Sequence, residues 1–131
     1  MTAPTANKAS ILLAHGSSDP NWLAPFDQLV LQIRDQLHQE RVELAYMELA
    51  QPSMEHSIQQ LAEQGFQVID VLPLFFAAGR HLRKDVPAML ERQQQQLQGQ
   101  GYDITLTLHP PIGLEPEMAS AISQVVVRKL S

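Results

Sequence analysis

Three residues of metal-ligand type follow three successive apolar segments of the chain, one after each segment. His15 follows residues 10–14, Glu48 follows residues 42–47, and His81 follows residues 67–74 after a short loop. Each is separated from the next by 33 residues, about the length of one strand and one helix. If the segments are parallel strands, their carboxyl ends meet at one edge of the sheet, where ligands bind in such folds. Two imidazoles and a carboxylate there could bind a borderline divalent metal and leave coordination positions for water or substrate.

A purely structural role for these residues stays open at this point. A histidine at a strand end often only caps or hydrogen-bonds the nearby backbone. Glu48 could instead form an ion pair with Arg80 or Lys84. The convergence of the three side chains is an inference from the expected order of strands and helices.

A basic cluster surrounds the second histidine. Arg80, Arg83 and Lys84 are three of the nine basic residues, and they fall within five positions of an acidic chain. They stand at the start of an expected helix, where free backbone N–H groups also favour anions. We therefore expect them to bind a polycarboxylate or phosphate ligand. The alternative is a solvated helix terminus.

The serines after His15 are expected to bind rather than to react. The sequence His15-Gly16-Ser17-Ser18-Asp19 lacks the G-x-S-x-G pattern of a nucleophile elbow. No phosphate loop of the form G-x-x-x-x-G-K-[ST] occurs either. We expect a tight turn in which backbone amides or the Ser17 hydroxyl contact an anionic group.

Alternating strands and helices would position these residues. Apolar runs and β-branched residues predict strands at 10–14, 42–47, 67–74 and 102–108, the last an alternating edge strand. Apolar spacings of three and four predict helices after residue 21 and from the Ser53 cap to Gly65. Helices are also expected over 86–97 and over 115–129, the last with acidic residues in its first turn and basic ones in its last. The first of these helices would bury Phe26, Leu29, Val30, Ile33 and Leu37. The β-α order, repeated four times, predicts an α/β fold with a four-stranded parallel sheet and helices on both faces.

Composition limits the class of protein. The chain has 131 residues, 44% of them hydrophobic, which suits a single domain at 10–131 after a flexible N-terminus at 1–9. A net charge of −5 argues against nucleic-acid binding, and the absence of cysteine excludes disulfides and thiolate metal sites. The longest apolar run, 71–78, is too short to cross a membrane, and the N-terminus does not resemble a secretory signal. We expect a cytoplasmic protein without a membrane partner.

Three segments resemble the signature stretches of the small class II tetrapyrrole chelatases. They are AHGSSDP (14–20), YMELAQPS (46–53) and PLFFAAGRHLRKDVP (73–87). The family patterns are roughly H-G-S-R-x-P, then E-x-x-x-P-S, then P-L-F-L-x-x-G-x-H-x-x-x-D-I-P. The likeness extends from about residue 11 to residue 130, and the third stretch is the most specific. Among these chelatases the chain is most similar to short-form CbiX and SirB-like sirohydrochlorin chelatases.

The resemblance implies a fold, a reaction and an assembly. The chain would be the flavodoxin-like half of a two-lobed chelatase, and a homodimer would rebuild the two-lobed cleft. It would insert a divalent metal, Co²⁺ first and Fe²⁺ or Ni²⁺ as alternatives, into sirohydrochlorin, for cobalamin or sirohaem, without an organic cofactor. The metal-site residues of the family fall on His15, His81 and Glu48, and one of these would also accept pyrrole protons.

The carboxylates of the tetrapyrrole would then be bound by the groups already singled out, namely Ser17, Arg80, Arg83 and Lys84. Other functions use the same residues. A metal or tetrapyrrole carrier would bind without turnover, and an interaction domain would keep the fold without the site. The residues do not decide between cobalt, iron and nickel.

Overall fold

The computed structural model describes residues 7–37, 41–77 and 79–131, except for the side chains of His81 and Leu82. The strands are β1 (Lys8–Ala14), β2 (Arg41–Tyr46), β3 (Val68–Pro73) and β4 (Thr105–Leu108). The α-helices are α1 (Pro20–Leu37), α2 (Met54–Glu63), α3 (Val86–Gly99) and α4 (Pro116–Leu130). A π-helical turn, η1 (His81–Asp85), precedes α3, and a 3-10 turn, η2 (Ile112–Leu114), precedes α4.

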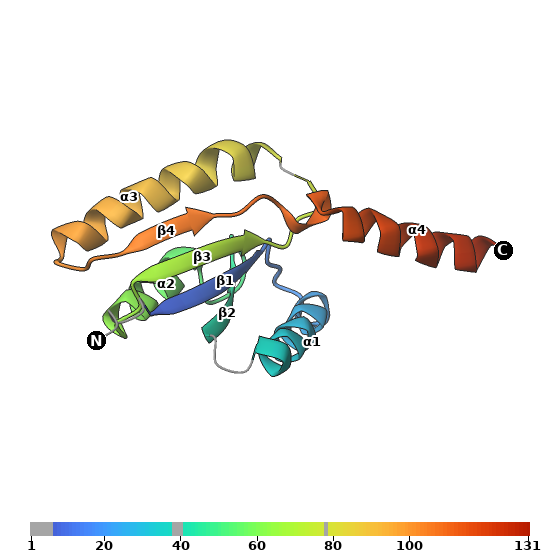
Figure 1. The fold of residues 1–131 in the computed structure, drawn as a ribbon, viewed down its shortest axis with the longest axis horizontal. Coiled ribbons are helices and arrows are strands. Elements are labelled where there is room, and N and C mark those ends of the chain that lie inside the picture. Colours follow the sequence, from blue (N-terminus) through green and yellow to red (C-terminus); the bar gives the residue numbers. More distant parts are fainter. Residues whose placement is uncertain (1–6, 38–40, 78) are drawn as a thin grey trace, which may run out of the picture.

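The four strands form one parallel sheet in the order β2-β1-β3-β4 (Figure 1). The chain moves from β1 to one side for β2, then returns past β1 to β3. The carboxyl ends of β1 and β3 therefore form the switch point at which parallel sheets bind ligands. The predicted α/β class and four-stranded parallel sheet are confirmed.

β4 is an edge strand, as its alternating sequence predicted, but it is shorter than expected. The backbone N–H of Leu106, on the open side of β4, donates to the side-chain oxygen of Gln94 at 3.0 Å. The predicted first residues of the strand are used differently. Gly101 has φ +96°, and the Tyr102 N–H donates to the carbonyl of Leu97. The turn that closes α3 thus occupies the residues expected to begin the strand.

One face of the sheet, which we call the closed face, is covered by α2 and α3. Ser53 caps α2 as predicted, since its hydroxyl accepts a hydrogen bond from the N–H of His56 at 3.1 Å. The amide of the buried Gln93 on α3 donates to the carbonyl of Glu55 at 2.6 Å and links the two helices. The main core lies beneath them and includes Ile11, Leu13, Ile58, Leu61, Ile69, Val71, Val86 and Leu97.

The opposite face, which we call the open face, is covered by α1 alone among the described helices. Its small core consists of Leu12, Val30 and Val42. The sequence predicted that Phe26, Leu29, Ile33 and Leu37 would be buried with Val30, but each keeps part of its surface exposed. The reason is that α4 does not pack beside α1. Figure 1 shows α4 extending beyond the carboxyl ends of the strands, and no residue of α4 is buried. Helices therefore cover both faces as expected, although α4 covers neither.

The start of the first strand also differs from the sequence prediction. β1 begins at Lys8, before residue 10, and Ala9 is already part of the core. Residues 1–6, where a flexible N-terminus was expected, lie outside the described residues. The segment between β3 and α3, for which the sequence predicted only a short loop before His81, contains the η1 turn. No helix in the described part of the chain is long and apolar enough to cross a membrane.

Candidate functional site

A pocket of about 210 Å³ lies at the carboxyl ends of β1 and β2, beside the first turns of α2 and α3. His15 and Glu48 both line it, so two of the three predicted ligands share one pocket. Its lining residues are Leu13, His15, Tyr46, Met47, Glu48, Met54, Glu55, Asp85, Val86 and Met89. The pocket therefore combines an apolar floor with one imidazole and several carboxylates.

The imidazole of His15 is exposed but held in place. Its ring stacks on the ring of Phe75, with 4.0 Å between the centroids and 17° between the planes. Phe75 follows β3 and is itself only 4% exposed, so it offers a fixed surface. Because β1 and β3 are hydrogen-bonded neighbours, the switch point sets the orientation of this histidine.

Glu48 is positioned by close contact between the loops after β1 and β2. The N–H of Met47 donates to the carbonyl of Ala14 at 2.9 Å, and the N–H of Glu48 donates to that of His15 at 3.1 Å. A Cβ at Gly16 would lie 1.8 Å from the carbonyl oxygen of Glu48, and Gly16 has φ +95°. Glycine is therefore required between the two loops, both for space and for its backbone conformation.

Tyr46, at the end of β2, anchors the other side of this loop. Its N–H donates to the carbonyl of Pro52 at 2.9 Å. Burial raises the pKa of the Tyr46 phenol, and the Asp27 carboxylate on α1 adds to this increase. The residues between Tyr46 and the Ser53 cap thus form a closed loop that presents Glu48 to the pocket.

Two further carboxylates in the pocket were not singled out from the sequence. Glu55 lies in the first turn of α2, and Asp85 ends η1 just before α3. Acidic residues at helix starts commonly complement the helix dipole, so neither position looked unusual. The signal that could have identified them is topological, since helices that return from parallel strands begin at the same edge as the site.

His81 begins the η1 turn that ends at Asp85, so its backbone belongs to the segment that reaches the pocket. Its side chain lies outside the described residues. Among the side chains that the structure describes, no group of three or more His, Cys, Asp or Glu residues is arranged to hold a metal ion. The set His15, Glu48 and His81 therefore stays a prediction, of which the structure places two members in one pocket.

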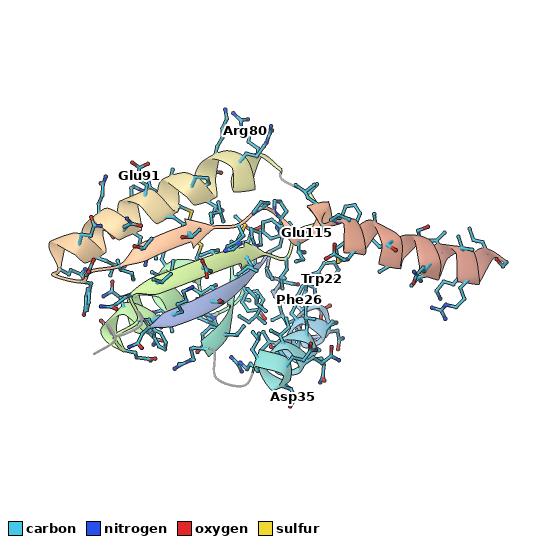
Figure 2. All side chains as sticks on the ribbon, viewed as in Figure 1. Trp22, Phe26, Asp35, Arg80, Glu91 and Glu115 are labelled. Atoms are coloured by element: carbon cyan, nitrogen blue, oxygen red, sulfur yellow. The ribbon has the colours of Figure 1, made fainter. Side chains whose placement is uncertain are left out.

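The predicted anion-binding residues lie outside the pocket. Arg80, Arg83 and Lys84 are exposed, and Figure 2 shows Arg80 directed outward at the start of η1 and α3. No ion pair in the described part of the chain joins Glu48 to Arg80 or Lys84. We call the edge of the sheet formed by the carboxyl ends of the strands the rim. The three cations are thus exposed beside the rim and accessible to a large anionic ligand.

The turn after His15 forms as expected. The Ser17 hydroxyl accepts a hydrogen bond from the N–H of Asp19 at 3.0 Å. The Asp19 carboxylate accepts from the N–H of Asn21 at 2.9 Å at the start of α1. Contact of Ser17 with an anionic ligand stays a prediction.

Comparison with known proteins identifies the family. The family model described as CbiX matches residues 9–129. The chain belongs to the CbiX family. The resemblance seen in the three sequence segments is therefore confirmed, and this chain is a short chelatase-type protein of the CbiX family.

Curated relatives of this CbiX-family chain are of similar length. The sirohydrochlorin cobaltochelatase of Sulfurisphaera tokodaii is 30% identical over 118 residues, which cover 88% of each chain. That of Saccharolobus solfataricus is 26% identical over 125 residues, covering 92% of this chain and 91% of the relative.

Solved structures agree with the family assignment and with the fold. The crystal structure of a cobalamin (vitamin B12) biosynthesis CbiX protein from Marinobacter aquaeolei has 43% identity and a TM-score of 0.81, with 94% of this chain and 97% of that chain covered. SirB from Bacillus subtilis, solved with Fe³⁺, shares the fold at 20% identity with a TM-score of 0.77. The match covers 90% of this chain and 45% of the SirB chain.

Proposed function

We propose that this CbiX-family protein inserts a divalent metal ion into sirohydrochlorin, with Co²⁺ as the first candidate and Fe²⁺ or Ni²⁺ as alternatives. Family membership and the cobaltochelatase relatives support the reaction. The observation that carries the proposal is the pairing of His15, stacked on Phe75, with Glu48 in one open pocket at the switch point.

The pocket suits the metal rather than the macrocycle. Its volume of about 210 Å³ is below the roughly 300–1,000 Å³ of pockets that enclose drug-sized ligands. The tetrapyrrole would therefore lie across the opening, with the metal between it and His15. Phe76 is 67% exposed on the same loop as Phe75 and offers an apolar surface to the ring.

Metal insertion requires a loosely held ion and a place for two pyrrole protons. His15, Glu48 and His81 would replace part of the hydration shell of the ion with a few exchangeable ligands. A closed set of ligands would store the metal instead of releasing it. Glu55 and Asp85 add negative charge at the same pocket, which favours a cation and provides acceptors for the protons.

The substrate carboxylates would be bound at the rim. Arg80, Arg83 and Lys84 are exposed there, and guanidinium groups pair with carboxylates in bidentate fashion. We also propose a homodimer, because the chain matches about half of the SirB chain, as one lobe of a two-lobed protein would. Two copies would then enclose one tetrapyrrole between their rims.

The decisive experiment follows the absorbance of sirohydrochlorin with Co²⁺ and a small amount of protein. Multiple turnovers per chain are expected. His15→Ala and Glu48→Gln should each reduce the insertion rate by about 100-fold or more, since each removes a ligand or proton acceptor. His56→Ala is the matched control, because His56 is exposed on α2 and does not line the pocket.

Two results would contradict the proposal. Binding of one equivalent without turnover would identify a carrier, and full activity of His15→Ala would remove the imidazole from the mechanism. Repeating the assay with Co²⁺, Fe²⁺ and Ni²⁺ under the same conditions tests the order of metals.

A further inference from the structure

Leu49 combines two features that are unfavourable for a leucine. Its backbone has φ 62°, a left-handed conformation in which the Cβ of a leucine is crowded by the neighbouring carbonyl oxygen. Its side chain is 69% exposed to solvent, so burial within the chain does not offset this cost. Glycine or asparagine would suit this backbone better. The leucine side chain is therefore better explained by contact with another molecule than by the fold of its own chain.

The backbone around Leu49 is held by the same contacts that position Glu48. The N–H of Glu48 donates to the carbonyl of His15 at 3.1 Å. The N–H of Tyr46 donates to the carbonyl of Pro52 at 2.9 Å and closes the loop. These two hydrogen bonds fix both ends of the short segment that contains Leu49. An exposed leucine is thus kept directly beside a residue of the candidate site.

Phe76 offers a second exposed apolar side chain beside the site. It is 67% exposed and directly follows Phe75, the ring on which His15 stacks. The loops that carry Leu49 and Phe76 follow β2 and β3, which lie on either side of β1. Because neighbouring strands are about 4.8 Å apart, the ends of β2 and β3 are about 10 Å from each other. Leu49 and Phe76 therefore lie on opposite sides of His15, which follows β1.

This arrangement limits the kind of molecule that could contact both side chains. Neither Leu49 nor Phe76 lines the pocket that holds His15 and Glu48, so the contact lies outside that pocket. A metal ion or a small anion cannot span about 10 Å. A flat, largely apolar macrocycle laid across the opening can do so. Its peripheral carboxylates would then lie near the exposed basic cluster around η1.

We infer that Leu49 and Phe76 are the apolar contacts on which the face of the tetrapyrrole rests, with His15 below the centre of the ring. Leu49 is the new element of this substrate site, and its left-handed backbone is the stability cost of presenting an apolar side chain beside Glu48. The inference rests on the proposed function and deepens it, because it assigns a residue that holds the ring rather than the metal. Leu49 therefore acts on the binding of sirohydrochlorin and not on that of the ion.

The first test titrates metal-free sirohydrochlorin into the protein and follows its absorbance. Leu49→Gly removes the side chain but adopts the left-handed backbone without strain, so the melting temperature should not fall. The dissociation constant for sirohydrochlorin should increase by about tenfold, since the contact covers much of a leucine side chain. Leu49→Asn, which also tolerates this backbone, should weaken binding similarly. Leu49→Met should stay within about threefold of the unaltered protein, because it keeps an apolar side chain of similar volume.

Two further readouts separate this role from a general effect on the site. The affinity for Co²⁺ alone, measured by calorimetry, should be the same for Leu49→Gly as for the unaltered protein. In the insertion assay, the KM for sirohydrochlorin should increase while kcat at saturating substrate changes little. Leu31→Ala is the matched control, because Leu31 is a 56% exposed leucine on α1 that does not line the pocket. It should leave the titration unchanged.

Failure of the inference can be told apart from failure of the proposed function. If the unaltered protein neither binds nor metallates sirohydrochlorin, the proposed function is wrong. If it does both and Leu49→Gly binds the tetrapyrrole equally well, only the inference is overturned. A melting temperature lowered by Leu49→Gly would show that the leucine packs within its own chain, and a lower mass in light scattering with an unchanged titration would show that it contacts a second copy. Either result would also overturn the inference.

Discussion

The two faces of the sheet are built differently although the same strands supply both. On the closed face, Ile11 of β1 and Val71 of β3 have no exposed surface beneath α2 and α3. On the open face, their sequence neighbours Leu12 and Leu72 belong to the small cluster beside α1, and Leu72 stays partly exposed. The closed face therefore provides most of the stabilising burial of the single chain, while the open face leaves more apolar surface exposed.

The candidate site belongs to the closed side of this division. Phe75, which supports His15, is part of the main core, as are Met54 and Val86 in the pocket wall. Under the proposed function, a rigid support of this kind would keep His15 oriented toward the metal ion. The molecule thus combines a well-packed face that supports the candidate site with a second face that is less completely covered.

The largest expected effect on the free energy of unfolding comes from substitutions of sheet residues, and it should differ between the two faces. Ile11→Ala should lower the free energy of unfolding by about 3–5 kcal/mol, because it leaves a cavity in a fully packed core. Leu72→Ala removes the same number of carbon atoms but should cost only about 1–2 kcal/mol in the isolated chain, because Leu72 is already partly exposed to water. Urea unfolding at low protein concentration measures both values.

The same two substitutions, Ile11→Ala and Leu72→Ala, also distinguish a dimer interface from a surface that is exposed to solvent. If a second copy covers Leu72, the cost of Leu72→Ala should increase with protein concentration, whereas that of Ile11→Ala should not beyond the common effect of dimerisation. Equal costs for the two substitutions at low concentration would show that the faces are not different in the way described.

The strands and the position of the site could be predicted from the sequence. The reason why the two faces of the sheet differ could not. The unbroken run Ile11-Leu12-Leu13-Ala14 indicated a strand covered on both sides, and the order of elements placed His15 and Glu48 on one rim. Residues 115–129 were also expected to form a helix, from the acidic and basic residues at its two ends. Periodicity shows which side of a helix is apolar, but it does not show what covers that side. Gly113, which lies shortly before α4, packs against the backbone of Phe76, and these two residues are distant in sequence.

A smaller effect on stability is expected at Gly16, where the loops after β1 and β2 are in contact. Gly16→Ala should destabilise the fold by about 2–4 kcal/mol, because it combines a backbone conformation unfavourable to alanine with a clash against the Glu48 carbonyl. Gly65→Ala is the matched control, since Gly65 has φ +96° but a Cβ added there would meet no atom within 4 Å. It should cost only about 1–2 kcal/mol. Thermal unfolding compares the two variants, and similar losses would mean that the loops after β1 and β2 are not tightly joined.

The linker before α4 offers a still smaller effect, confined to the open side. Gly113→Ala should push the linker away from the Phe76 backbone and change the direction of α4. Because Gly113 is partly exposed, we expect a loss of about 1–2 kcal/mol in stability. Dimer dissociation should increase by about tenfold, equivalent to about 1.4 kcal/mol. Sedimentation over a range of concentrations measures the dissociation. Unchanged dimerisation would show that the direction of α4 does not depend on this contact.

The smallest expected effect concerns Tyr46, at the end of β2, where α1 meets the rim. Burial, and then the Asp27 carboxylate, raise the pKa of its phenol in the folded chain, whereas in the unfolded chain the phenol ionises near pH 10. As the pH rises past about 10, the unfolded chain loses this proton first, so the folded chain binds more protons and stability falls with pH. Below that range the contribution is complete. Tyr46→Phe should therefore reduce the alkaline loss of stability between about pH 9 and pH 11, and Asp27→Asn should reduce it by less, because Asp27 is the lesser cause. Urea unfolding across this range is the measurement. A Tyr46→Phe variant that loses as much alkaline stability as the unaltered chain would place the phenol in water, and the α1 side of the rim would then be more open than the structure shows.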